Sequence, residues 1–254
     1  MRLTDYWKRA WQFARWFPRN SVNGRRFGVP YFRGSNFNMP SSIRVANRIA
    51  PLSVPNEAGV NSDFVECFIY NIYGLGHGLE QVRTIVDIGA NVGFFSLAAR
   101  GYYPNATIHA YEPNPRIQGL LRANTARFNI EVFSEAVGGK AGQVALTDES
   151  VSNMARTRPS EDGTSGISQI RLDSALERIG GAIDLLKMDC EGAEWEMFGL
   201  TGCWESIKNI RMEYHLFNGE SVEQVVRTLS GLGFQIARLD PSRDNMGIIW
   251  GRRC

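Results

Sequence analysis

The stretch VDIGANVGFFS, residues 86–96, has the residue types of a loop that binds a nucleotide-like ligand. Asp87 lies in an apolar run, and Gly89 and Gly93 follow it with GxxxG spacing. Glycine has no Cβ, so the backbone can approach a ligand closely at these positions. A dinucleotide-binding loop would have the spacing GxGxxG, and an acid beside it would repel a pyrophosphate. The stretch therefore indicates a ligand that carries an ammonium group.

A second acid ends the next apolar stretch. In HAYEP, Glu112 stands 25 residues after Asp87. An acid about 20 residues after the loop commonly accepts hydrogen bonds from ribose hydroxyls in nucleotide-binding folds. S-adenosylmethionine (SAM) carries both an ammonium group and a ribose, and its product is S-adenosylhomocysteine. The glycine loop and the two acids together predict a SAM site.

Polar residues alternate along two later apolar stretches. Lys187 and Asp189 share one strand face in LLKMD, as do Glu213 and His215 in RMEYH. Buried polar side chains are costly unless they are paired or functional, so we expect these four to meet at one edge of the sheet. There His215 would act as general base for an acceptor hydroxyl, with Asp189 orienting it or binding the SAM amino group. Lys187 would lower the pKa of the hydroxyl, or would instead form a salt-bridge network with neighbouring glutamates.

A divalent metal ion is an open alternative at this place. Asp189, Glu213 and His215 offer oxygen and nitrogen donors that suit such an ion. No metal-specific spacing accompanies them, and the nearby Lys187 would oppose a cation. The sequence leaves the metal undecided.

Strand and helix patterns alternate from residue 84 onward, which predicts an α/β fold with a mostly parallel sheet and helices on both faces. Strands are expected at residues 84–89, 107–112, 130–137, 183–189 and 207–214, with extra strands at 143–148 and 167–172. Helices are expected at residues 94–102, 115–128, 173–180 with Asp173 as N-cap, from about 193, and 221–233. Residues 234–240 and 247–253 are expected to close the sheet as an antiparallel pair.

Residues 1–60 form a basic helical and loop extension before a core domain of residues 61–254. The chain of 254 residues has a net charge of +2, yet residues 1–50 alone carry +9. Residues 4–17 place tryptophans at helical spacing opposite basic side chains, which predicts an amphipathic helix. Such a helix either lies at a membrane interface or packs on the core domain or on a second subunit. The charge favours contact with a membrane surface or an anionic substrate.

Several stretches resemble the FkbM-type methyltransferases, a family of class I SAM-dependent enzymes. IDLLKMDCEGAEWEMF, residues 183–198, is similar to the family signature D-x-x-K-x-D-x-E-G-x-E. VDIGANVG resembles the first methyltransferase motif, and IRLDSAL and IRMEYH resemble the segments on either side of the signature. The resemblance covers about residues 80–215. It implies a Rossmann-like sheet of seven strands, SAM as methyl donor, and usually O-methylation of a small molecule or sugar.

The resemblance assigns residues to the SAM site by their positions in the motifs. Asp87, Gly89, Asn91 and Gly93 match the motif around the methionine part of SAM, and Glu112 matches the ribose ligand. The pair that ends the third strand borders the adenine, where backbone groups often make the contact. The residues expected to bind SAM are Asp87, Gly89, Asn91, Gly93, Glu112, Glu135, Ala136 and Asp189.

The function that the sequence favours is SAM-dependent O-methylation of a sugar, glycan or other small-molecule hydroxyl. A macrolide-like or other natural-product acceptor is the alternative. The missing GxGxxG disfavours an oxidoreductase, and the missing PPY-type motif and RNA-binding module disfavour a nucleic-acid methyltransferase. Intact cofactor positions disfavour a non-catalytic binding protein.

Features of the whole chain favour a cytoplasmic location. The sequence has no apolar run of about 18 residues and no apolar signal core. Its four cysteines include no CxxC pair, which disfavours structural zinc and a disulfide framework. The N-terminal helix would place the enzyme at the inner face of a membrane if it binds lipid. The oligomeric state is left open.

Overall fold

The computed structural model describes residues 18–29, 38–57, 59–147, 155–159, 166–243 and 245–253. The amphipathic helix predicted over residues 4–17 lies outside these ranges, so membrane contact through it stays a prediction. Across the described ranges, no helix combines the length and apolar character needed to cross a membrane.

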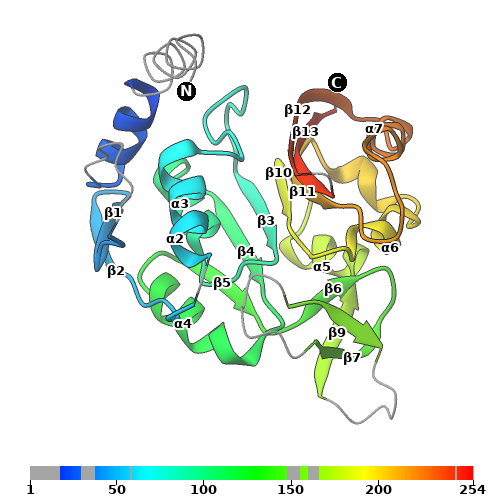
Figure 1. The fold of residues 1–254 in the computed structure, drawn as a ribbon, viewed down its shortest axis with the longest axis horizontal. Coiled ribbons are helices and arrows are strands. Elements are labelled where there is room, and N and C mark those ends of the chain that lie inside the picture. The colour runs from blue at the N-terminus through cyan, green and yellow to red at the C-terminus, as the bar shows by residue number, and fades with distance from the viewer. Residues whose placement is uncertain are drawn as a thin grey trace, which may run out of the picture.

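A seven-stranded sheet forms the centre of the molecule (Figure 1). Its strand order is β12-β13-β11-β10-β3-β4-β5. The first five strands of the sheet in chain order run parallel, and β13 is antiparallel to both β11 and β12. This arrangement confirms the predicted Rossmann-like sheet with an antiparallel C-terminal pair. Its strands are β3 (Thr84–Ile88), β4 (Thr107–Tyr111), β5 (Ile130–Phe133), β10 (Leu185–Met188), β11 (Asn209–His215), β12 (Gln235–Arg243) and β13 (Met246–Arg252).

Alternate residues of the central strands enter two apolar cores, one on each face of the sheet. On β3, Ile85 packs in one core, whereas Val86 packs in the other. On β10, Leu185 and Leu186 divide in the same way. The first core includes α3, and the second includes α5 and α7, so helices cover both faces as predicted (Figure 1). The helices of this domain are α3 (Phe94–Tyr102), α4 (Pro115–Thr125), α5 (Leu172–Ile179), α6 (Glu194–Phe198) and α7 (Val222–Gly231).

The described part of the N-terminal extension packs onto the core domain. Residues 18–26 are helical, and β1 (Ser42–Val45) and β2 (Arg48–Pro51) form an antiparallel hairpin beside α3 (Figure 1). Phe27 and Val45 are buried in the same apolar core as α3. The helix α2 (Val60–Phe64) and the π-helix η1 (Val65–Tyr70) then lead into β3.

The predicted strand 130–137 is broken into two strands that belong to different sheets. β5 ends at Phe133, and β6 (Ala136–Gly138) joins a second sheet of order β6-β9-β7-β8. The other strands of this sheet are β7 (Gly142–Leu146), β8 (Thr157–Pro159) and β9 (Ile167–Arg171). The break places Glu135 at the junction of the two sheets.

The prediction that Asp173 caps α5 is wrong. The helix begins one residue earlier, and its N-cap is Arg171, which makes no side-chain cap hydrogen bond. Asp173 lies in the first turn, where its carboxylate accepts hydrogen bonds from the Arg171 guanidinium and the Ser174 N–H. The attraction of the arginine for the carboxylate explains why the acid does not serve as the cap.

Candidate active site

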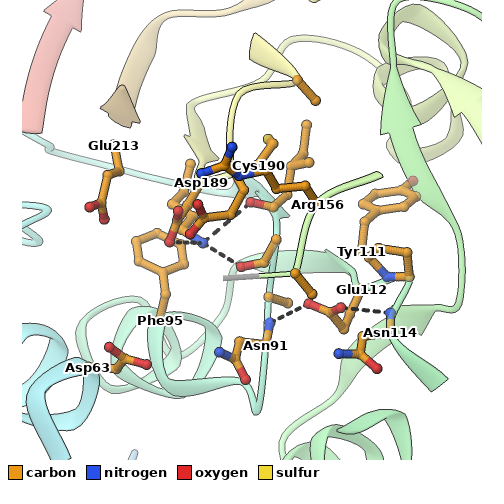
Figure 2. A pocket seen from close by; sticks show the side chains of 18 of the residues that line it. Asp63, Asn91, Phe95, Tyr111, Glu112, Asn114, Arg156, Asp189, Cys190 and Glu213 are labelled. Atoms are coloured by element: carbon orange, nitrogen blue, oxygen red, sulfur yellow. Dashed lines mark hydrogen bonds and ion pairs between the residues drawn. The ribbon is translucent and has the colours of Figure 1, made fainter. Parts of the chain in front are cut away.

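A cavity of about 670 Å³ lies where the parallel strands end (Figure 2). Its wall includes residues that follow β3, β4, β10 and β11, the edge of a parallel sheet at which ligands usually bind. Small-molecule sites range from about 300 to 1,000 Å³, so a nucleoside cofactor and part of an acceptor fit within it. Every residue predicted for the site lines the cavity except Asp87 and Gly93.

Glu112 is held at one end of the cavity by two backbone groups. Its Oε2 accepts a hydrogen bond from the Asn91 N–H and its Oε1 accepts one from the Asn114 N–H, both at 2.8 Å (Figure 2). Burial raises the pKa of this carboxyl to about 7. Each oxygen keeps a lone pair for a further donor. The Oδ1 atom of Asn91 is also buried, without a hydrogen-bond partner among the described residues. These acceptors fit a ligand that brings hydroxyl or ammonium donors.

Glu112→Ala is expected to weaken SAM binding about 100-fold, because hydrogen bonds from ribose hydroxyls to a carboxylate contribute about 1.5–3 kcal/mol each. Calorimetry with SAM measures the change, and a thermal melt checks the fold. In the native protein the affinity should also fall about tenfold from pH 8 to pH 6, because a carboxyl with a pKa of about 7 is mostly protonated at pH 6.

The exposed Glu80 provides the control, since Glu80→Ala should leave SAM affinity unchanged. Unchanged affinity in Glu112→Ala, or an undiminished pH dependence in that variant, would contradict the ribose assignment.

Apolar residues line the cavity at the β5–β6 junction. Ala136 and Val137 line it together with Tyr111, whose ring stacks on Phe133. The Glu135 carboxylate is paired with the Arg178 guanidinium and so is already engaged. This placement agrees with a contact through backbone groups at the junction. The adenine assignment of Glu135 and Ala136 stays a prediction.

The two glycines of the loop are required by the protein's own packing. Gly89 has a φ of +75°, and a Cβ there would lie 1.8 Å from the Asp189 carbonyl oxygen. Gly93 has a φ of +90°, and a Cβ there would lie 2.9 Å from the Leu121 side chain. Close contact with protein atoms therefore accounts for the missing side chains at both positions, and the contact of Gly89 and Gly93 with SAM stays a prediction.

Gly89→Ala is expected to destabilise the fold far more than Gly78→Ala, which isolates the clash with Asp189. Both glycines have a positive φ, but a Cβ on Gly78 would meet nothing within 4 Å. Left-handed backbone costs a non-glycine residue about 1–2 kcal/mol. Urea unfolding should show about that loss for Gly78→Ala and a clearly larger one for Gly89→Ala. Equal losses would mean that the β10 segment moves freely away from the loop.

Asp87 lies beneath the cavity and does not line it. It is fully buried, and its Oδ2 accepts a hydrogen bond from the Ser96 hydroxyl at 2.6 Å. Its Oδ1 lies 3.3 Å from the Lys187 ammonium. Burial raises the pKa of Asp87, although Lys187 and Ser96 oppose that shift. Contact of Asp87 with SAM stays a prediction, and its surroundings favour support of the loop through Lys187.

Lys187 connects the glycine loop to the acceptor side. Its Nζ donates to the Gly89 carbonyl at 2.6 Å and lies 3.5 Å from Asp189 Oδ2. Burial alone would lower the pKa of Lys187, but Asp87 and Asp189 outweigh it and the pKa is raised. Lys187 therefore forms a salt-bridge network, one of the two roles that the sequence predicts for it. Its partners are Asp87 and Asp189, not the neighbouring glutamates.

Carboxyl groups gather at the other end of the cavity. Asp189 Oδ2 accepts a hydrogen bond from the Tyr73 hydroxyl at 3.3 Å. Glu213 lines the same space, and in Figure 2 Asp189 lies between Glu213 and Glu112. Burial, together with repulsion by Asp189, raises the pKa of Glu213 to about 9. At neutral pH Glu213 therefore keeps its proton until a positive charge enters the cavity.

His215 faces carboxylates with both ring nitrogens. Its Nδ1 lies 2.8 Å from Glu194 Oε1, and its Nε2 lies 3.6 Å from Glu191 Oε2. Burial would lower the pKa of His215, but the hydrogen bond with Glu194 outweighs it and the pKa rises to about 9. In this state the ring is protonated at neutral pH, which weighs against its predicted role as general base. That role remains untested.

The sequence interpretation did not include several residues of the site. Glu191 and Glu194 belong to the motif D-x-E-G-x-E, and the sequence connects them to the site only as alternative salt-bridge partners of Lys187. Tyr73 lies between η1 and β3, in a stretch of the sequence that gives no signal for a site. Arg156 places its guanidinium 3.4 Å from the centre of the Phe217 ring, and both line the cavity.

A mostly parallel seven-stranded sheet of this strand order, with an antiparallel C-terminal pair and a glycine loop after β3, is the fold of class I SAM-dependent methyltransferases. The Methyltransferase FkbM domain family matches residues 87–236. The chain belongs to this family.

Two curated relatives are similar to this chain in sequence over most of their length. The 31-O-demethyl-FK506 methyltransferase FkbM of Streptomyces tacrolimicus is 30% identical over 207 residues, 66% of this chain and 79% of that protein. Methyltransferase sdnD of Sordaria araneosa is 29% identical over 233 residues, 75% of this chain and 88% of that protein. Among solved structures, magnesium protoporphyrin IX methyltransferase of Synechocystis PCC 6803 with bound SAM has a TM-score of 0.48 and 12% identity, covering 80% of this chain and 87% of that one.

Proposed function

We propose that this methyltransferase transfers the methyl group of SAM to a hydroxyl oxygen of a small natural product. The observation that carries the proposal is one cavity with a held ribose-type carboxylate at one end and a group of carboxyls at the other. The name of the Streptomyces relative, which specifies a 31-O-demethyl compound, supports an oxygen acceptor of this kind. A sugar hydroxyl is the second candidate, favoured by the family resemblance.

The residues of the cavity fit SAM along its length. Glu112 would accept the ribose hydroxyls, and the buried Oδ1 of Asn91 would accept a further donor. Tyr111 and Ala136 would border the adenine in the apolar part of the wall. Asp189 would attract the ammonium group of the methionine part. When bound, SAM supplies a methyl group already activated by a sulfonium.

The acceptor-side residues would align the hydroxyl and remove its proton. Glu213 lines the cavity, and within the described residues no hydrogen bond holds its carboxyl. Asp189, by contrast, is held in place by Tyr73 and Lys187. Glu213 is thus the side chain best placed to receive a proton, and Asp189 to hold the acceptor or the donor. The positive charge of the sulfonium favours the ionised form of Glu213, whose pKa is raised by burial.

The charge of the cavity favours a neutral or cationic acceptor over an anionic one. Among the described residues, seven carboxyl groups line it, of which Glu213 keeps its proton at neutral pH, against the two permanent cations Arg156 and Lys187. Lys187 is already bound to aspartates and a backbone carbonyl. The positive charge of the N-terminal segment suggests an anionic substrate, but within the described part of residues 1–50 no lysine or arginine lines the cavity. The seven carboxyls belong to Asp63, Glu66, Glu112, Glu135, Asp189, Glu191 and Glu213.

Calorimetry with SAM and S-adenosylhomocysteine, followed by a methyl-transfer assay, tests the proposal. Saturable binding of both compounds is expected. Labelled SAM is then offered with macrolide-type alcohols, free sugars and matched amines, and the products are analysed by mass spectrometry. Methyl ethers of the macrolide-type alcohols support the proposal. Methylated sugars would favour the second candidate, and N-methylated amines would overturn oxygen as the acceptor atom.

A further inference from the structure

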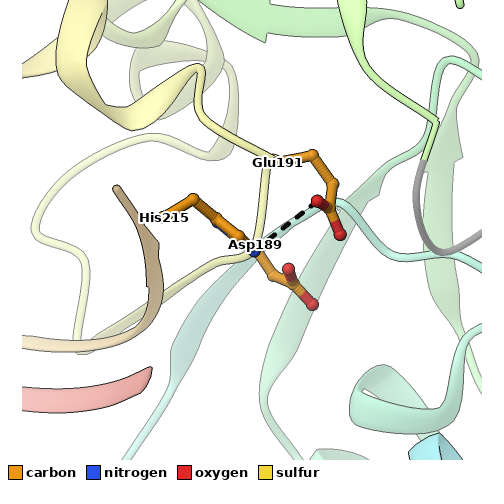
Figure 3. A group of neighbouring side chains, drawn as sticks. All are labelled: Asp189, Glu191 and His215. Atoms are coloured by element: carbon orange, nitrogen blue, oxygen red, sulfur yellow. Dashed lines mark ion pairs between the residues drawn. The ribbon is translucent and has the colours of Figure 1, made fainter. Parts of the chain in front are cut away.

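We propose that Asp189, Glu191 and His215 form a binding site for a divalent cation such as Mn²⁺. Each offers one ligand atom, and these atoms all lie within 4.8 Å of one another. Asp189 and Glu191 follow β10, and His215 ends the neighbouring strand β11. Figure 3 shows the three side chains turned toward a common point. All three also line the cavity, so a cation there would face the acceptor.

The surroundings of His215 point to a ligand at its Nε2 atom. The side chain is 1% exposed, and Nε2 has no hydrogen-bond partner among the described residues. The 3.6 Å between Nε2 and Glu191 Oε2 is too long for a hydrogen bond. Nδ1, by contrast, lies 2.8 Å from Glu194 Oε1. Metal-binding histidines usually donate their other ring N–H to a carboxylate, which turns the free lone pair toward the ion.

The two carboxylates keep oxygen atoms available toward the same point. Asp189 uses Oδ2 for the Tyr73 hydroxyl and the Lys187 ammonium. No described residue is hydrogen-bonded to its Oδ1, which leaves this atom as the ligand. Glu191 has a φ of +52°, uncommon for a residue other than glycine, and this backbone conformation brings its carboxyl beside His215.

Lys187 does not occupy the site, although the sequence suggested that it would oppose a cation. Its ammonium is engaged by the Gly89 carbonyl at 2.6 Å and by Asp87 at 3.3 Å. It approaches Asp189 only through Oδ2, at 3.5 Å. Asp189 and Glu191 repel one another within the cluster, and a divalent cation between them would reduce that repulsion.

The donor set of two carboxylate oxygens and one imidazole nitrogen suits a first-row divalent ion better than calcium, which prefers oxygen alone. Three protein ligands leave coordination positions open toward the cavity. If the proposed methyl transfer to oxygen holds, the ion would bind the acceptor hydroxyl and make it more acidic. Only this role depends on the proposed function; the ion-binding site itself does not.

The test is a titration of the full chain, stripped of metal by chelation, with MnCl₂ while the signal of free Mn²⁺ is followed by electron paramagnetic resonance. One saturable site per chain is expected. Glu191→Gln should weaken binding at least about tenfold, as loss of groups around a metal commonly does. Glu66→Gln removes the same charge from the same cavity outside the cluster, and it should leave the affinity nearly unchanged.

Pulsed measurements on bound Mn²⁺ in the native chain should also show coupling to an imidazole nitrogen. This readout needs no variant, so it holds even where substitution of the buried His215 prevents folding. The proposal is overturned by the absence of a saturable site, by equal weakening in Glu66→Gln and Glu191→Gln, or by the absence of nitrogen coupling. SAM binding is measured separately. Mn²⁺ binding without SAM binding would contradict only the proposed function. SAM binding without Mn²⁺ binding would contradict only the cation site.

Discussion

Lys187→Met is expected to lower the free energy of unfolding by about 3–5 kcal/mol, the usual cost of removing one partner of a buried ion pair. Asp87 is fully buried and the Lys187 side chain is 4% exposed, so water screens the pair very little. The substitution leaves the Asp87 carboxylate with only the Ser96 hydroxyl as a partner. It also frees the Gly89 carbonyl, so the glycine loop should loosen with the fold.

Urea unfolding of four proteins measures this coupling: native, Lys187→Met, Asp87→Asn and the double variant. The double variant should be more stable than Lys187→Met alone, because a neutral amide in place of Asp87 no longer needs a cation. Ser62 offers an exposed control at the same cavity, since Ser62→Ala should change stability by less than about 0.5 kcal/mol. If the losses of the two single variants simply add, the two groups are not coupled.

The sequence predicted the strands of the sheet well, because their apolar runs are long and separated by clear helical patterns. The carboxyl ends of parallel strands meet at one edge of a sheet, so the place where the polar residues meet could be predicted. Glu112, Asp189, Glu213 and His215 all line one cavity there. The pairing of Lys187 with Asp87 could not be predicted from the sequence. It depends on the register of two strands 100 residues apart in the chain, in which Lys187 stands directly beside Asp87.

The partners of His215 depend on features that a sequence pattern does not carry. Glu191 reaches the ring because its own backbone is left-handed, and Glu194 reaches it from the first turn of a short helix. Tyr73 enters the site from a turn-rich segment after η1, where no periodic pattern marks it. The break between β5 and β6 is only two residues long, Ser134 and Glu135, so the apolar residues on either side of it read as one strand.

Glu213→Gln is expected to lower kcat about 100- to 10,000-fold, the range that a positioned general base contributes. Glutamine has nearly the same shape but does not accept a proton, so the fold and the SAM affinity should change little. Glu213 is the candidate because His215 is enclosed by Glu191 and Glu194, whereas no described group is hydrogen-bonded to Glu213. Steady-state kinetics with a confirmed acceptor measures kcat and KM separately, and calorimetry measures SAM affinity.

Glu66→Gln is the matched control, because it removes one negative charge from the same cavity. An equal fall of kcat in both variants would mean that Glu213 acts through the general negative potential and not as a base. A higher KM at unchanged kcat would mean that Glu213 binds the acceptor equally in the ground and transition states. The proton would then have to pass to Asp189 or His215. If the cation site exists, Asp189 and His215 are both ligands of the ion, so the proton would instead have to leave to water in the cavity.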